Sequence, residues 1–383
     1  MRIGIDIRSL AAGKRTGVEE YTIGLLKELF QSGDEHEYVL FFNAWGEVEP
    51  DLSWASGFSN VTIRRFRIPN KLLNFSLWYF QRPHLDRLIG GVDVFFMPNL
   101  NFAAFSKKVR VLVTAHDLSF EFFPEHFSFK QRLWHFAINF RALLRRADHI
   151  VAVSESTEND LITVYGVPKE KIQVIYSGID DRFAPMNRND LGLLAVQEKY
   201  HLPYKFFLYL GTIEPRKNLE SLVKAFEVYR RTVIGEMAKY ELVLAGRPGW
   251  KYDRLFEAIK HSSAKEAIHL IGFVDDSDKP ALYNLASAFV YPSFYEGFGF
   301  PPLEALACGT PVIASHSASL PEVIGEAGVL IDPYRPDEIL QALREITKDK
   351  SFQEKLRARA LAQRQSFTWQ KAGQIFQCLL ERK

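Results

Sequence analysis

Hydrophobic and polar positions alternate along this chain in two distinct ways. Short runs of β-branched and aromatic residues are followed by longer segments in which apolar residues recur every three or four positions. Such an order of strand and helix patterns is typical of a parallel sheet covered by helices on both faces. The pattern occurs twice, so the sequence predicts an α/β protein with two Rossmann-like halves.

Six strands are predicted in each half. In the first half they span 2–7, 38–42, 92–97, 109–115, 149–153 and 172–175. In the second half they span 206–210, 241–245, 268–271, 288–291, 311–314 and 328–331. The turn-rich stretch between the halves predicts an interdomain linker at 181–203. A final helix is predicted at 368–380, and its spacing alone assigns it to neither half.

Composition narrows the class of protein further. A chain of 383 residues exceeds the usual size of one core, which agrees with two domains. A net charge of +2 argues against a nucleic-acid-binding protein, and no apolar run is long enough to span a bilayer. Cys308 and Cys378 stand outside any metal-binding spacing. We therefore expect a cytoplasmic protein with neither a disulfide nor a bound metal.

The segment 291–309 carries the strongest candidate chemistry. Gly297 and Gly299 allow a tight loop after a buried strand, and the two prolines that follow suit the first positions of a helix. We predict that this helix ends near Gly309 and that Glu304 lies in its first turn. The helix N-terminus then forms an anion site beside Glu296 and Glu304. Carboxylates next to an anion site fit a ligand that combines hydroxyls with a diphosphate. In the alternative interpretation, Glu304 only complements the helix dipole and Glu296 is a solvated loop residue.

A second loop supplies positive charge. Arg216 and Lys217 follow the predicted strand 206–210, and Asn218 is a suitable N-cap for the next helix. The carboxyl ends of parallel strands are where open α/β sheets bind ligands, so both cations are well placed for a diphosphate. They could stabilise the charge of a departing nucleoside diphosphate. Simple solvation is the alternative for an isolated pair of cations.

Two weaker signals lie in the first half. The loop 9–18 contains Gly13 and Gly17 but matches neither GxGxxG nor a P-loop, so a plain turn explains it as well as a phosphate-binding loop does. His116 and Asp117 follow the predicted strand 109–115. His116 could bond a sugar hydroxyl, or it could be structural while Asp117 caps a turn; spacing leaves both open.

Two further features have ordinary alternatives. Asp276 and Asp278 match the acid-x-acid spacing of some metal sites, but Asp278 precedes a helix and is better interpreted as an N-cap. The basic and aromatic stretch 64–87 is typical of core helices with solvated cations. It could instead form a surface for anionic lipid. The residues that would make up that surface are Arg64, Arg65, Arg67, Lys71, Trp78 and Tyr79.

Taken with their order, these motifs resemble a known family. The segments 211–218, 153–156, 296–304 and 319–323 are similar to those of glycosyltransferase family 4, the group 1 transferases with the GT-B fold. The resemblance implies two facing Rossmann-like domains with parallel sheets and a central cleft. It assigns 1–180 with 368–383 to an acceptor domain and 204–367 to a donor domain.

The resemblance also implies an activity and roles for residues. The activity is transfer of a hexose from a nucleotide diphosphate sugar with retention of configuration and without a metal or other cofactor. Arg216, Lys217, Glu296 and His116 would form the catalytic set. Glu296 would contact donor sugar hydroxyls, Glu304 the ribose, and His116 the sugar. Arg216 and Lys217 would bind the diphosphate. Backbone donor contacts are implied for Gly17, Gly297, Phe298, Gly299 and Phe300.

The sequence departs from the family pattern at one point and resembles one group within the family at another. Gly17 is followed by Val rather than the Arg common in the family, which leaves the role of this loop open. The stretch 116–127 resembles mannosyltransferases of O-antigen and related surface polysaccharides, which favours GDP-mannose and a saccharide or lipid-linked acceptor. Peripheral contact with the inner face of the membrane is then expected. Alternatives are a UDP-sugar donor, a sugar-nucleotide epimerase or hydrolase on the same fold, and a non-catalytic binding partner.

Overall fold

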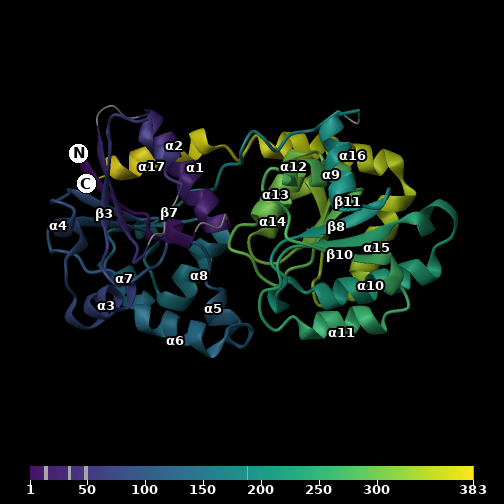
Figure 1. Cartoon of the computed structure of the whole chain (residues 1–383), viewed down its shortest axis with the longest axis horizontal. Coiled ribbons are helices and arrows are strands. Elements are labelled where there is room, and N and C mark those ends of the chain that lie inside the picture. Colours follow the sequence, from purple (N-terminus) through teal and green to yellow (C-terminus); the bar gives the residue numbers. More distant parts are fainter. Residues whose placement is uncertain (13–15, 33–35, 47–50, 188, 383) are drawn as a thin grey trace. The chain divides into compact units, whose positions relative to one another are not determined.

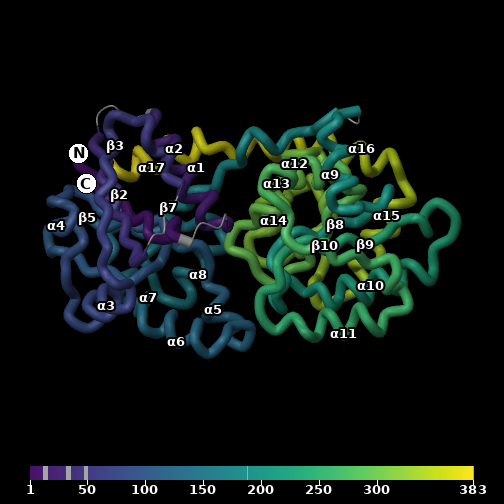
Figure 2. Tube along the Cα trace, viewed as in Figure 1, coloured from purple at the N-terminus to yellow at the C-terminus, as the bar shows by residue number. Residues whose placement is uncertain are grey.

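The computed structural model describes residues 1–12, 16–32, 36–46, 51–187 and 189–382. The chain forms two compact units, traced by colour in Figures 1 and 2. The first comprises residues 1–178 and 368–383, and the second comprises residues 179–367. The segment 181–203, for which we predicted a linker, lies within the second unit.

The described residues of the first unit form a seven-stranded parallel sheet. Its strand order is β3-β2-β1-β4-β5-β6-β7. The strands are β1 (Arg2–Asp6), β2 (Glu37–Asn43), β3 (Val61–Phe66), β4 (Val94–Met97), β5 (Arg110–Ala115), β6 (His149–Ala152) and β7 (Ile172–Val174). The strands β1 and β4 are neighbours although β2 and β3 separate them in sequence, so the direction of sheet growth reverses there.

One strand of this sheet, β3 (Val61–Phe66), was missed by the sequence pattern. Arg64 and Arg65 interrupt its apolar residues, and both are exposed. β3 pairs only with β2 and lies at the edge of the sheet. An edge strand tolerates charges that a central, doubly covered strand does not, so its sequence lacks the continuous apolar run on which the other predictions rest.

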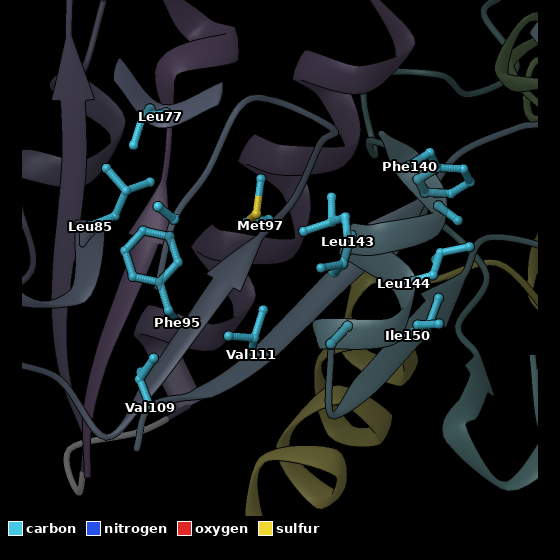
Figure 3. Packing of buried hydrophobic residues seen from close by; sticks show 14 of the residues in the cluster. Leu77, Leu85, Phe95, Met97, Val109, Val111, Phe140, Leu143, Leu144 and Ile150 are labelled. Carbon is cyan, nitrogen blue, oxygen red and sulfur yellow. The ribbon is translucent and has the colours of Figure 1, made fainter. Parts of the chain in front are cut away.

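Helices cover the sheet of the first unit. They are α1 (Gly17–Ser32), α2 (Ser53–Ser56), α3 (Asn70–Phe75), α4 (Leu85–Leu88), α5 (Ser119–Phe122), α6 (Phe129–Ile138), α7 (Phe140–Arg146), α8 (Glu155–Tyr165) and α17 (Trp369–Glu381). Short turns are η1 (Arg8–Ala12), η2 (Ser76–Phe80), η3 (Pro124–His126) and η4 (Lys169–Lys171). On one face, Leu77 of η2, Leu85 of α4 and Leu143 of α7 pack against Phe95 and Val111 of the strands (Figure 3).

The last helix, α17, completes the first unit. It packs beside α1, and Figure 1 shows the yellow and purple ribbons next to each other. The ring of Phe376 lies 4.5 Å from that of Phe96 in β4. Trp369 fills the space beside two glycines: a Cβ on Gly24 would lie 2.2 Å from its ring, and one on Gly178 would lie 2.2 Å from its backbone nitrogen. The small residues therefore let α17 approach closely.

The described residues of the second unit form a six-stranded parallel sheet of order β10-β9-β8-β11-β12-β13. The strands are β8 (Phe206–Leu210), β9 (Glu241–Ala245), β10 (Ile268–Gly272), β11 (Ala288–Tyr291), β12 (Val312–Ser315) and β13 (Gly328–Ile331). β8, β9, β11 and β12 are almost entirely buried. Their apolar runs are continuous for that reason, and the sequence predicted all six within a residue at either end.

Helices also cover the second sheet. They are α9 (Leu191–Lys199), α10 (Leu219–Thr232), α11 (Asp253–His261), α12 (Lys279–Leu285), α13 (Phe300–Ala307), α14 (Leu320–Ile324), α15 (Pro336–Lys348) and α16 (Lys350–Arg364). Short turns are η5 (Pro215–Lys217), η6 (Gly235–Lys239), η7 (Lys265–Ala267) and η8 (Gly325–Ala327). α9 falls in the expected linker and packs on α12. Asp190 caps it by accepting a bond from the Gly192 nitrogen, so part of the turn-rich composition there belongs to a helix start.

Candidate functional site

Two loops of the second unit meet where its sheet changes direction. β8 and β11 are neighbours, β9 and β10 extend the sheet on one side, and β12 and β13 extend it on the other. The loop after β8 carries Arg216 and Lys217, and the loop after β11 carries Glu296. The Phe294 nitrogen donates to the Arg216 carbonyl at 2.9 Å and ties the loops together. Such a switch point is the usual ligand site of an open parallel sheet.

Glu296 lies between the two cations. Its Oε1 is 2.5 Å from Lys217 Nζ, and its Oε2 is 3.0 Å from Arg216 Nη1. Lys217 and Glu296 are buried, and Arg216 is largely so. The structure thus brings together three residues that the sequence analysis placed in one site, although 79 positions separate Lys217 from Glu296 along the chain.

These contacts fix the protonation of the cluster. Burial by itself would raise the pKa of Glu296, but the charges of Arg216 and Lys217 outweigh it and hold that pKa at about 2. Burial and the nearby Arg216 lower the pKa of Lys217, while Glu296 opposes them. Glu296 is therefore ionised at neutral pH and accepts hydrogen bonds without donating one.

Three polar residues that the sequence analysis did not single out complete the cluster. Glu214 Oε1 accepts a bond from Arg216 Nη2 at 2.9 Å. The Tyr291 hydroxyl accepts from Lys217 Nζ at 2.7 Å, and Ser293 Oγ donates to Glu296 at 2.5 Å. Each lies within five positions of a motif residue and at the end of a buried strand, which is the signal that could have found it.

Glu304 lies one residue further into its helix than predicted. α13 begins at Phe300, so Glu304 belongs to the second turn, and the first turn holds no acidic residue. The helix starts one position before Pro301 because Gly299 already turns the backbone there. Glu304 is buried, and the Tyr283 hydroxyl donates to its Oε2 at 2.7 Å. The dipole explanation for this carboxylate is weakened, because charge–dipole effects fall off within the first turn.

The loop between the glutamates is held in one shape. Gly299 has a φ of +110°, and a Cβ there would lie 2.9 Å from a methyl carbon of Leu320, so only glycine fits without strain. Ser319 Oγ lies 2.9 Å from the Glu296 carbonyl oxygen and 2.7 Å from that of Phe298. The segment with Gly297, Phe298, Gly299 and Phe300 therefore enters α13 in a fixed conformation.

Asn218 does not act as the predicted side-chain cap. It directly precedes α10 but has a left-handed backbone with a φ of +56°, and its side chain donates to the Pro333 carbonyl at 2.7 Å. Asparagine tolerates this conformation better than most residues, which accounts for its presence. Its role is to join the loop after β8 to the segment that follows β13.

The acid-x-acid pair is occupied by cations of the chain itself. Asp276 forms ion pairs with Arg182 and Lys279, and Asp278 forms one with Lys199. Asp278 precedes α12 without a side-chain capping bond, contrary to our interpretation, because its carboxylate faces Lys199. Across the described ranges, no cluster of three or more His, Cys, Asp or Glu side chains could hold a metal.

The candidate residues of the first unit are His116 and Gly17. His116 follows β5, and its Nε2 is 2.7 Å from the Pro98 carbonyl oxygen, so this nitrogen carries the proton when the ring is neutral. Burial lowers the pKa of His116, although Pro98 and Asp117 oppose the shift. Asp117 accepts bonds from the Ser119 nitrogen and hydroxyl, as the turn-cap alternative predicted. The ring leaves Nδ1 as an acceptor for a hydroxyl.

Gly17 is the first residue of α1 and is exposed. Residues 13–15 of the predicted glycine loop, Gly13 among them, lie outside the described residues. The Thr16 nitrogen donates to Glu19 Oε2 at 2.7 Å. This bond satisfies a donor just before the helix, as a capping residue does. The structure therefore places Gly17 at a helix start and adds no further ligand-binding feature to it.

Comparison with known proteins identifies the family. The model of Glycosyl transferases group 1 matches residues 196–363, and that of Glycosyltransferase Family 4 matches residues 15–183. The chain belongs to this glycosyltransferase family. An O-antigen chain mannosyltransferase B of Escherichia coli is 32% identical over 93% of both chains. The O-antigen chain mannosyltransferase RfbU of Salmonella typhimurium is 30% identical over 83% of both.

Solved glycosyltransferases share its fold. Anabaena HepE, whose structure holds UDP and glucose, covers all of both chains with a TM-score of 0.76 and 19% identity. WaaG, a glycosyltransferase of lipopolysaccharide biosynthesis, covers both chains fully with a TM-score of 0.72 and 14% identity. These matches confirm the GT-B fold and its two parallel-sheet domains. Among the described residues, no helix is long and apolar enough to cross a membrane.

Proposed function

We propose that this glycosyltransferase moves mannose from GDP-mannose to a saccharide or a lipid-linked saccharide, with retention of configuration and without a metal. The observation that carries the proposal is the buried cluster of Arg216, Lys217 and Glu296 at the switch point of the second sheet. The second unit would be the donor domain and the first the acceptor domain.

The charge of the cluster suits a diphosphate. Two cations, Arg216 and Lys217, face two carboxylates, Glu214 and Glu296, in a largely buried setting. Removing such charges from water is costly, and stability alone is a weak reason to keep them buried. Arg216 would bind phosphate oxygens with its planar guanidinium and Lys217 would act as a point charge. Both would stabilise the nucleoside diphosphate as it leaves.

The carboxylates would bind hydroxyls and leave proton transfer to the substrates. An ionised Glu296 is a poor general acid and a good acceptor for donor sugar hydroxyls. Glu304 would accept bonds from the ribose, and the N-terminus of α13 would face the diphosphate. The acceptor hydroxyl would attack from the face that the diphosphate leaves, and a phosphate oxygen would take its proton. His116 would contact the sugar through Nδ1.

Support for mannose comes from the named relatives. Two O-antigen chain mannosyltransferases are at least 30% identical over most of this chain. Their names support a role in O-antigen or related polysaccharide synthesis. We place that role at the cytoplasmic side of a membrane, with peripheral contact through a lipid-linked acceptor. The UDP and glucose in HepE keep a UDP-sugar as the alternative donor.

Donor binding and transfer can be measured separately. A thermal-shift panel of GDP-mannose, UDP-glucose and ADP-glucose should show the largest stabilisation with GDP-mannose, because a ligand of the native state raises apparent stability. Incubation of that donor with mannosylated acceptors should then yield an elongated saccharide whose new linkage has the donor configuration. Free or altered sugar formed rapidly from donor alone would favour a hydrolase or epimerase instead.

A further inference from the structure

An aromatic platform stands exposed on the first unit. We define it as Leu72, Phe75, Trp78, Tyr79 and Phe80, on α3 (Asn70–Phe75) and the π-helical turn η2 (Ser76–Phe80). These five side chains are 48% to 66% exposed. Apolar residues of this size are normally buried, so five within nine positions mark a surface that contacts something apolar.

The platform is rigid and is supported from below. Leu73 and Leu77 of the same elements are buried and belong to the apolar cluster on the sheet (Figure 3 shows Leu77). Phe75 and Tyr79 stack with their planes 4° apart and their ring centres 5.7 Å apart. Phe80 meets both rings edge to face. The exposed rings are therefore held in place and do not need to reorder when they bind.

The stretch of chain that contains the platform carries charge of one sign. From residue 52 to residue 85 the chain contains no Asp or Glu, while it contains five Lys and Arg. They are Arg64, Arg65, Arg67, Lys71 and Arg82, and all are exposed. Within the part of the chain that the structure describes, none of these five forms an ion pair. Elsewhere on this protein exposed cations commonly do, as Lys199 and Arg335 illustrate.

We propose that this surface docks the protein onto an anionic phospholipid bilayer. Trp78 and Tyr79 have the amphipathic rings that settle at the level of lipid headgroups, and Phe75 and Phe80 would reach the acyl boundary. The unpaired cations would meet lipid phosphates. Pairing with a second copy is disfavoured, because the same cationic stretch on both copies would repel.

Docking through the platform would bring the proposed transferase to a membrane. The platform and the donor site share no residue, so substitutions in the platform leave the side chains of Arg216, Lys217 and Glu296 unchanged. The inference rests on the proposed function in one respect: a lipid-linked acceptor would be reached at the membrane. Vesicle binding is measured without donor or acceptor, so its failure and the failure of the proposed activity are distinguishable.

Vesicle flotation with the full chain tests the inference. The chain should float with vesicles of phosphatidylglycerol and phosphatidylcholine, and much less with phosphatidylcholine alone or at high salt. Exchanging Arg64, Arg65 and Arg67 for Gln together should weaken binding roughly a hundredfold, at about fivefold for each cation. Trp78→Ser with Tyr79→Ser should weaken it at least about tenfold. Tyr204→Ser, at a tyrosine of the second unit that is 87% exposed, is the control and should bind as wild type does.

Tryptophan fluorescence distinguishes insertion from loose attraction. Anionic vesicles should shift the emission of the wild type to shorter wavelength, and Trp78→Phe should remove most of that shift while the protein still floats. The Arg variants keep every ring, and circular dichroism checks that they fold as the wild type does. The inference is overturned if no binding occurs at low salt or if binding survives both sets of substitutions. It is equally overturned if the chain forms a dimer that depends on Trp78 and Tyr79 and ignores vesicles.

Discussion

The carboxyl ends of the two sheets hold charge in different ways. In the second unit, Arg216 and Lys217 share Glu296 across two loops. In the first unit, Asp6 and Arg8 at the end of β1 form a buried pair within a single turn, with Arg8 Nη2 2.6 Å from Asp6 Oδ2. The ion pair of the first unit joins residues two positions apart, whereas the ion pairs of the second unit join residues up to 80 positions apart.

We interpret the pair in the first unit as structural, in contrast to the functional role proposed for the cluster in the second unit. Arg8 also donates to the Phe102 carbonyl, so it joins the loops after β1 and β4. Glu296 instead lies between two cations at the switch point, where, as proposed, the phosphates of a donor would bind the same cations. The same kinds of residue at equivalent edges thus serve fold in one unit and, as proposed, chemistry in the other. Substitutions in the two units should reveal this contrast.

The largest effect is expected from the cations of the second unit. Exchanging Arg216 and Lys217 for Ala together should lower kcat at least about a thousandfold, because the charge that stabilises the leaving diphosphate is lost. Steady-state transfer assays measure this, and circular dichroism checks the fold. Turnover within a few-fold of wild type would remove both residues from the proposed mechanism and would erase the contrast with Arg8.

Glu296→Gln should reduce turnover roughly a hundredfold and should also change the response to acid. The amide keeps the shape of the side chain but leaves two cations without their shared carboxylate. In the wild type, the folded pKa of Glu296 is about 2, below its unfolded value near 4.3. Its stabilising contribution is therefore present above about pH 4.3 and is lost as the pH falls toward about 2.

Urea titrations at neutral pH and at roughly pH 3 measure that loss. The difference in unfolding free energy between the wild type and Glu296→Gln should shrink by about 2 kcal/mol over this interval. A difference that does not vary with pH would show that Glu296 is not held ionised by its neighbours. Asp6→Asn in the first unit is the matched comparison for a pair closed within one turn.

A smaller effect is expected in the first unit. His116→Ala should lower kcat about tenfold, because one bond to the sugar is lost, while the dissociation constant of GDP alone stays within twofold. Since burial lowers the pKa of His116, the ring is neutral at pH 7. The pH profile of the variant should therefore keep the wild-type shape from neutral pH upward. A lost activity limb in that range would show that the imidazolium takes part.

The smallest effect is expected at Tyr283. Tyr283→Phe removes the hydroxyl that donates to Glu304 and leaves that carboxylate short of one buried bond. We expect donor KM to rise about threefold to tenfold and kcat to change little, as suits a positioning residue. Calorimetric binding of GDP provides the readout. An equal fall in kcat and kcat/KM would instead place this contact in the transition state.

Sequence reasoning found the second unit more completely than the first. Continuous apolar runs give away doubly covered strands such as β8 and β11, and the residues directly after them are then candidates by position. β3 was not predicted because charged residues interrupt the apolar run of this edge strand. The turn of Glu304 was misplaced because the exact first residue of a short helix depends on the backbone of Gly299, which the pattern does not encode.

The hydrogen-bond partners of the site residues could not be predicted from the spacing of residues along the sequence. Tyr283 and Glu304 are 21 positions apart, and the contact of Asn218 with Pro333 spans 115 positions. Which donor meets which acceptor over such separations follows from the packing of helices on a sheet. For Asp278 the pattern favoured a helix cap, but its carboxylate forms an ion pair with Lys199 of α9 instead. Local propensity was overridden by a charge brought in by tertiary structure.

The return of α17 to the first unit has a consequence for the order of folding during synthesis. Residues 179–367 form one continuous stretch, so the second unit can fold as soon as it leaves the ribosome. The first unit emerges earlier but lacks Phe376 against Phe96, and Trp369 beside Gly24, until α17 is made. The half of the enzyme that is translated first is thus completed last, and until then apolar side chains such as Phe96 lack the partner that α17 supplies.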